Sequence, residues 1–153
     1  MAWLAFGFGG VGGAAGGDGY VWAGSDKGHT RDAGQVAANG GVGTLIALLS
    51  ALFPSPLWFP LFLGVMATVT ADTWATELGT LAKQPPRLIT TGRVVERGTS
   101  GGVTGLGTAV SLLGGLIIGL TAWLVGSGGW WLLLLGGAGG LAGSLTDSLL
   151  GAT

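Results

Sequence analysis

Residues 102–125 read GVTGLGTAVSLLGGLIIGLTAWLV and contain no charged side chain. A membrane-spanning helix needs about 20 consecutive apolar residues, so this stretch is long enough to cross a bilayer. Its glycines and alanines alternate with larger apolar residues, and such small residues let the backbones of neighbouring membrane helices approach closely. The stretch therefore predicts a transmembrane helix that packs against other helices.

Four further apolar segments accompany it, at residues 1–23, 35–53, 57–81 and 130–151. Charged residues make up 8% of the chain, against roughly 25% in soluble domains, and the mean hydropathy is +0.66. We therefore expect residues 1–153 to form a single integral membrane domain. Its predicted fold is all-α, a polytopic transmembrane helix bundle of about five helices.

The charges follow a one-sided pattern. All six Lys and Arg lie in two polar loops, residues 24–32 and 83–100, whereas the turns at 54–56 and 126–129 carry no charge. Basic loops mark the cytoplasmic side of a membrane protein, so we expect the active site on the cytoplasmic face. The net charge of −1 argues against a nucleic-acid partner, and the absence of cysteine excludes thiol catalysis.

The segments also pair into a duplicated helical hairpin. One hairpin opens on the glycine-rich residues 39–44 and ends near Asp72, and the other opens on residues 101–105 and ends near Asp147. Each hairpin crosses the membrane twice, so both acidic ends return to the same face. This parallel repeat disfavours the inverted-repeat plan of many transporters.

Both acids sit on helix faces made of small and hydroxyl residues: Gly64, Thr68, Thr76 and Gly79 around Asp72, and Gly136, Gly140 and Gly143 before Asp147. We expect these faces to pack closely and to bring both carboxylates into the bundle. Glu77 follows Asp72 by five positions and can join the same site only from a helix end or a local distortion. Intramembrane acids usually mark ion sites or catalysis; the plainer interpretation is that both aspartates bond to neighbouring backbone at the interface.

The polar loops supply groups that can bind phosphate. Arg97 precedes a glycine-rich turn, Thr99, Ser100, Gly101 and Gly102, that leads into a helix, and backbone N–H groups in such turns bind phosphate. In the first loop Lys27 and Arg31 could clamp phosphate and Asp32 could bind metal or orient Arg31, with Gln35 and Asn39 close by in sequence. Topology alone also explains basic loops. Carboxylates, basic groups and a glycine-rich turn at one face fit metal-dependent phosphate chemistry.

Four ordered motifs resemble the membrane family that contains transmembrane protein 19 and plant phytyl-phosphate kinase: residues 31–40, 71–79, 98–104 and 147–152. The resemblance covers most of the chain from Lys27 onward. It implies a membrane enzyme that uses a nucleoside triphosphate, CTP by kinship with polyprenol kinases, to convert an isoprenoid monophosphate into the diphosphate.

The resemblance also implies roles for the polar residues. Asp72, Glu77 and Asp147 would coordinate Mg²⁺, with Asp32 as a further ligand, and Arg97 with the turn 99–102 would cradle the nucleotide phosphates. Lys27 and Arg31 would hold the lipid phosphate, helped by hydrogen bonds from Gln35 and Asn39. So short a bundle is expected to need a second copy, as a homodimer, to enclose a site. Two alternatives stay open: a related cytidylyltransferase, and a membrane cation or proton transporter that uses the buried acids.

Overall fold

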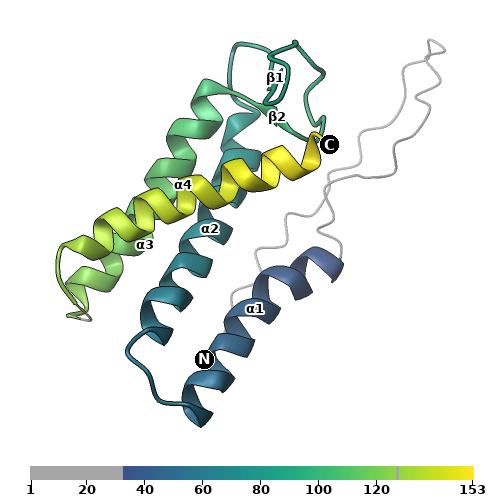
Figure 1. The fold of residues 1–153 in the computed structure, drawn as a ribbon. Coiled ribbons are helices and arrows are strands. Elements are labelled where there is room, and N and C mark those ends of the chain that lie inside the picture. The colour runs from purple at the N-terminus through teal and green to yellow at the C-terminus, as the bar shows by residue number, and fades with distance from the viewer. Residues whose placement is uncertain (1–32, 127) are drawn as a thin grey trace, which may run out of the picture. The chain divides into compact units, whose positions relative to one another are not determined.

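The computed structural model describes residues 33–126 and 128–153, where four helices and two short strands form (Figure 1). They are α1 (Ala33–Leu52), α2 (Trp58–Gly79), β1 (Arg87–Leu88), β2 (Gly102–Val103), α3 (Gly105–Leu124) and α4 (Trp131–Gly151). The last four predicted segments are confirmed as helices. The first predicted segment, residues 1–23, lies outside the described residues, so a count of five helices stays a prediction.

The predicted start of the fourth segment was wrong by three residues. Gly102 and Val103 do not begin the helix but pair, as β2, antiparallel with Leu88 and Arg87. Thr104 then caps α3: its backbone is extended, and its side-chain oxygen accepts the N–H of Gly107 at 2.9 Å. Because the cap residue itself stays outside the helix, α3 begins at residue 105.

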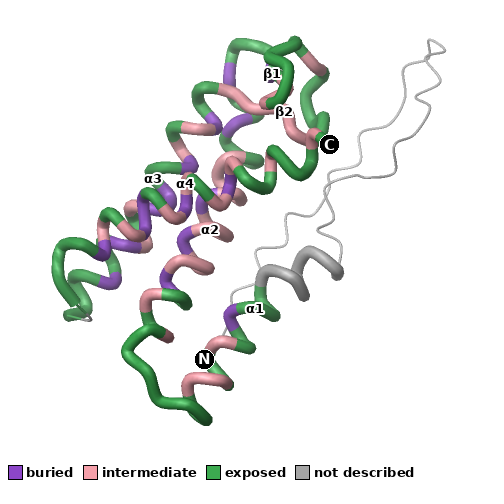
Figure 2. The backbone as a smooth tube through the Cα atoms, viewed as in Figure 1, coloured by how far each residue is buried: buried purple, intermediate pink, exposed green. Residues whose placement is uncertain are grey.

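Three helices form the packed part of the described chain. α2, α3 and α4 contact one another along their lengths, whereas α1 contacts α2 more sparsely. α3 is antiparallel to both partners, since Gly107 near its start lies against Gly79 near the end of α2, and Gly119 near its end lies against Leu132 near the start of α4. Figure 2 shows buried positions along these three helices, while the short turns between α1 and α2 and between α3 and α4 are exposed.

The interior is built from small residues and the outer surface from large ones. Ala67 and Ala71 are fully buried together with Leu132, and glycines fill most other buried positions of α3 and α4. Large apolar side chains point outward instead, among them Leu45, Leu48, Leu61, Leu113, Ile117, Leu120 and Leu134. A water-soluble protein would bury such side chains. Small residues inside and large apolar residues outside are typical of helices that pack in lipid.

The closest contact between the backbones of two helices joins α3 and α4. A Cβ atom placed on Gly136 would lie 2.8 Å from the backbone nitrogen and 2.9 Å from the Cα of Gly119, and closer still to the carbonyl oxygen of Gly115. Optimal carbon contacts are about 3.5–4.0 Å. Only glycine therefore permits this spacing between the two backbones.

Two of the described helices, α3 and α4, are long and apolar enough to span a membrane, and the apolar part of α1, Gly40–Leu52, is shorter. The two hairpins pack differently. α3 and α4 meet through backbone contacts between glycines, whereas Gly43 of α1 lies against the side chains of Phe62 and Met66. The predicted duplication of one hairpin is therefore not confirmed by the packing.

Candidate functional site

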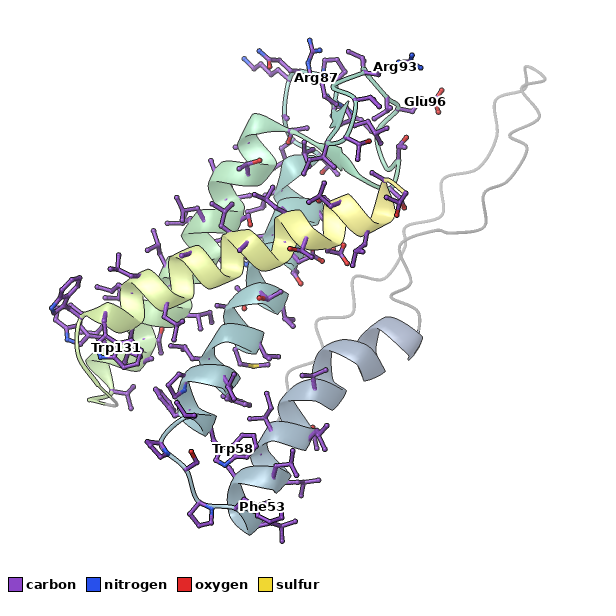
Figure 3. The ribbon with its side chains drawn as sticks, viewed as in Figure 1. Phe53, Trp58, Arg87, Arg93, Glu96 and Trp131 are labelled. Atoms are coloured by element: carbon purple, nitrogen blue, oxygen red, sulfur yellow. The ribbon has the colours of Figure 1, made fainter. Side chains whose placement is uncertain are left out.

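Every charged side chain in the described part of the chain lies in, or toward, one end of the helix bundle. Lys83, Arg87, Arg93, Glu96 and Arg97 belong to the loop between α2 and α3, and the three remaining acids lie in the halves of α2 and α4 that approach this loop. Figure 3 shows Arg87, Arg93 and Glu96 at the loop, while Phe53, Trp58 and Trp131 mark the uncharged turns at the opposite end. The one-sided charge pattern predicted from the sequence is thus confirmed for these residues.

Asp72 is the acid that enters the bundle. It is half-buried on α2, and its Oδ1 accepts a hydrogen bond from the Ser144 hydroxyl of α4 at 3.4 Å. Ser144 itself is only 3% exposed. A carboxylate among apolar helices is costly unless its oxygens find donors, and the serine supplies one of them. The bond also fixes the carboxylate between α2 and α4.

A second buried hydroxyl lies at the same level. On α3, Gly107 packs against Ala75 and Gly114 packs against Ala71, so Ser111, midway between them on the same face, lies beside the turn of α2 that carries Asp72. Ser111 is 1% exposed, and its Oγ has no hydrogen-bond partner among the described residues. Together, Asp72, Ser111 and Ser144 form a polar layer within an interior of glycine and alanine.

Outward-facing hydroxyls behave differently. Those of Thr44, Thr121 and Thr146 each donate to the carbonyl oxygen four residues earlier in their own helix. Thr68, which faces α4, instead donates to the carbonyl of Gly139 on that helix at 3.3 Å. The hydroxyls of Thr68 and Ser144 therefore connect α2 with α4, whereas that of Ser111 has no partner among the described residues.

The other two predicted metal ligands, Glu77 and Asp147, are exposed. α2 is uninterrupted to Gly79, so Glu77 points about 140° away from Asp72 around the helix axis. No group of three or more His, Cys, Asp or Glu in residues 33–126 and 128–153 could hold a metal ion. Mg²⁺ commonly takes only one or two carboxylates and completes its shell with water and substrate phosphates. A single carboxylate, that of Asp72, fits Mg²⁺ coordination that is completed by water and phosphate. It does not fit a site in which protein side chains supply every ligand.

The glycine-rich turn is closed by its own backbone bonds. Gly98 and Gly101 have φ of 88° and 77°, values that favour glycine, and the N–H of Gly102 donates to the carbonyl of Thr99 at 3.0 Å. A Cβ atom on Gly101 would overlap Ala152 just after α4. The turn therefore lies against the end of α4, and the sequence motifs at 98–102 and 147–152 are neighbours in space.

Arg97 ties the same loop to α2. Its Nη1 donates to the carbonyl of Thr80 and its Nη2 to that of Ala82. These carbonyls lie just past the end of α2, where backbone acceptors lack helical partners and the helix dipole favours a cation. The guanidinium has five N–H donors in total, so two bonds to the backbone leave three for a ligand.

The first-loop residues Lys27, Arg31 and Asp32 lie outside the described residues, and Gln35 and Asn39 belong to the first two turns of α1. Sequence reasoning missed Ser111 and Ser144. The signal for Ser144 was its place four residues after Gly140 on the small-residue face of α4. Ser111 sits in the same way four residues after Gly107 on α3.

Comparison with known proteins places the chain among membrane proteins. Residues 21–153 match the model of the family described as integral membrane protein DUF92. An uncharacterized membrane protein of Methanocaldococcus jannaschii, MJ0933, is 43% identical over 122 residues, which cover 80% of this chain and 50% of the relative. Protein PGR of Arabidopsis thaliana is 40% identical over 102 residues, 60% of this chain and 35% of the relative.

The chain thus spans half of the first relative and about a third of the second. No solved structure matches it. The family match covers most of the chain and agrees with an interior of small residues beneath an apolar surface. The chain therefore belongs to the integral membrane protein family DUF92.

Proposed function

We propose that this protein is a membrane-embedded lipid-phosphate kinase. It would transfer the terminal phosphoryl group of a nucleoside triphosphate, CTP by preference, to an isoprenoid monophosphate. The observation that carries the proposal is Asp72, an acid held within an apolar bundle by Ser144. It lies in the half of α2 that leads to the loop in which all the described basic residues lie. The motif resemblance to phytyl-phosphate kinase supplies the substrate class.

The reaction needs alignment and charge neutralisation more than a strong base. An oxygen of the lipid monophosphate attacks the γ-phosphorus and forms a new P–O bond. The bond from that phosphorus to the β–γ bridging oxygen breaks, and the nucleoside diphosphate leaves. A phosphate monoester is largely deprotonated at pH 7, because its second pKa is about 6, so no side chain has to remove a proton.

The residues divide this work between them. Asp72, with Asp147 nearer the loop, would hold Mg²⁺ that arrives with the nucleotide, whereas Glu77 points about 140° away from Asp72 and would stay outside this pair. When bound, Mg²⁺ neutralises charge on the phosphates. The free donors of Arg97 and the turn 99–102 would contact the nucleotide phosphates. Lys27 and Arg31 would hold the lipid phosphate. Asp32 would orient Arg31 or bind metal.

The register of α1 supports a contribution from Gln35 and Asn39. Gly43 lies against Phe62 and Met66 of α2, and α1 leads through a short turn into α2, so the two helices are antiparallel. Asn39 and Gln35 are therefore one and two turns closer to the charged end than Gly43. By the positive-inside rule this end would face the cytoplasm.

The test is turnover by the purified protein in detergent with Mg²⁺, a nucleoside triphosphate and phytyl, geranylgeranyl or farnesyl monophosphate. Asp72→Asn should abolish diphosphate formation, and Glu96→Gln, which alters an exposed loop acid, should leave it nearly unchanged. Transfer of a cytidylyl group instead would favour the cytidylyltransferase alternative. Absence of turnover with every nucleotide, together with ion flux in liposomes that Asp72→Asn removes, would replace the kinase with a transporter.

A further inference from the structure

A groove of about 500 Å³ runs between α1, α2 and α4. Its lining includes Val42 from α1, Pro60, Gly64 and Thr68 from α2, and Leu135 and Gly139 from α4. The groove is separate from the tight α3–α4 contact, and its volume lies in the range of small-molecule sites, about 300–1,000 Å³.

Two glycines create the hollow. A Cβ atom on Gly64 or on Gly139 would meet no atom within 4 Å, unlike the Cβ atoms at the glycines that join helices. The groove is lined mostly by apolar side chains, and its one hydroxyl, on Thr68, already uses its hydrogen in a bond to the carbonyl of Gly139 at 3.3 Å. Such a lining suits a ligand that is mainly hydrocarbon.

The groove points away from the charged end. Along α2 it extends from Val69 back to Pro60, roughly 14 Å at 1.5 Å per residue, toward the uncharged turn. Asp72 lies less than one turn beyond Val69, on the side of the loop. A lipid whose phosphate lies at the level of Asp72 or nearer the loop would have its tail directed along this groove.

We propose that this groove holds the isoprenoid tail of the substrate and that Gly64 and Gly139 leave the space into which its methyl branches fit. The inference rests on the proposed lipid-phosphate kinase activity for the nature of the headgroup. The shape and the apolar lining of the groove do not depend on that activity. An experiment can therefore reject the tail site without rejecting the kinase activity, or the reverse.

The experiment compares two groove-filling variants, Gly64→Leu and Gly139→Leu, with Gly41→Leu as control. Gly41 is an exposed glycine of α1 whose added Cβ would also meet nothing within 4 Å, and it does not line the groove. Binding of geranylgeranyl monophosphate and of dimethylallyl monophosphate, which has a tail of one isoprene unit, is measured for each protein in nanodiscs. Turnover of both lipids is measured in parallel.

Each groove-filling variant should weaken geranylgeranyl phosphate binding by about tenfold or more, the effect of losing two buried methylene contacts. Dimethylallyl phosphate binding should change less than twofold, and Gly41→Leu should match the wild type for both lipids. If the groove variants still turn over both lipids and the ratio of the two affinities is unchanged, the proposed tail site is rejected. The proposed kinase activity is then retained. Groove-dependent binding of geranylgeranyl phosphate without turnover would support the groove and reject the kinase.

Discussion

Replacing Gly136 with alanine tests whether the backbone contact between α3 and α4 holds the bundle together. The new methyl group would lie 2.8 Å and 2.9 Å from backbone atoms of Gly119, so the two helices must separate by roughly 0.6–1 Å to reach a normal contact. Overpacking destabilises a folded protein by about 1–3 kcal/mol. The atoms in contact here belong to the backbone and cannot rotate away as a side chain could, so we expect a value at the upper end of this range. The higher helix propensity of alanine offsets about 1 kcal/mol of the loss. We expect a net loss of about 2 kcal/mol.

Gly139→Ala is the matched control, since it makes the same change on the same helix where no atom lies within 4 Å of the new methyl group. Only the helix propensity acts there, so this variant should gain up to about 1 kcal/mol. The assay is the free energy of unfolding of both variants in mixed micelles titrated with sodium dodecyl sulfate. Equal stabilities for the two variants would show that α3 and α4 do not pack through their glycines.

Three further substitutions probe the charged end and the polar layer. Thr104→Ala removes the hydroxyl that accepts the Gly107 amide and should cost about 1 kcal/mol, while Thr104→Ser retains it; thermal unfolding in detergent separates the two. Ser111→Ala deletes a buried hydroxyl without a described partner, so it should leave stability unchanged or raise it; a loss above about 1 kcal/mol in the same assay would mean that the hydroxyl has a bond partner. Arg97→Lys replaces the planar guanidinium, which donates to two carbonyls at once, with an ammonium group that cannot reproduce this geometry. We expect amide hydrogen exchange to become faster in residues 80–104 and to stay unchanged in α3.

The helices could be predicted from the sequence because their ends carry strong local signals. Prolines at 54–56 and glycines at 126–129 break the apolar runs, and the observed helices stop within two residues of those breaks. The start of α3 lacked such a signal. Gly102 and Val103 join a strand pair with residues about 15 positions earlier, and no periodicity within the segment reveals a partner that distant.

The packing faces were predicted only in part. On α4, Gly136 and Gly140 are buried as expected. On α2 the buried line runs through Leu63, Ala67 and Ala71, one residue away from the expected line through Gly64 and Thr68. α2 packs against two helices at once, α3 on one side and α4 on the other. Because small residues occur at many positions of α2, its sequence does not reveal which row of residues becomes the buried one.

The small-residue interior also bears on where the proposed lipid substrate would enter. Between α3 and α4 the backbones touch at Gly115 and Gly136, so no ligand fits between those helices. α2 is different, because its Gly64 side opens into the groove shared with α1 and α4. Asp72 is hydrogen-bonded to α4, less than one turn beyond that groove, and the first turns of α1 lie toward the same charged end. For the proposed lipid, this groove would give access from the side of α1. A cross-link that fixes α1 to α2 at the groove should block lipid binding, whereas one between α3 and α4 should not.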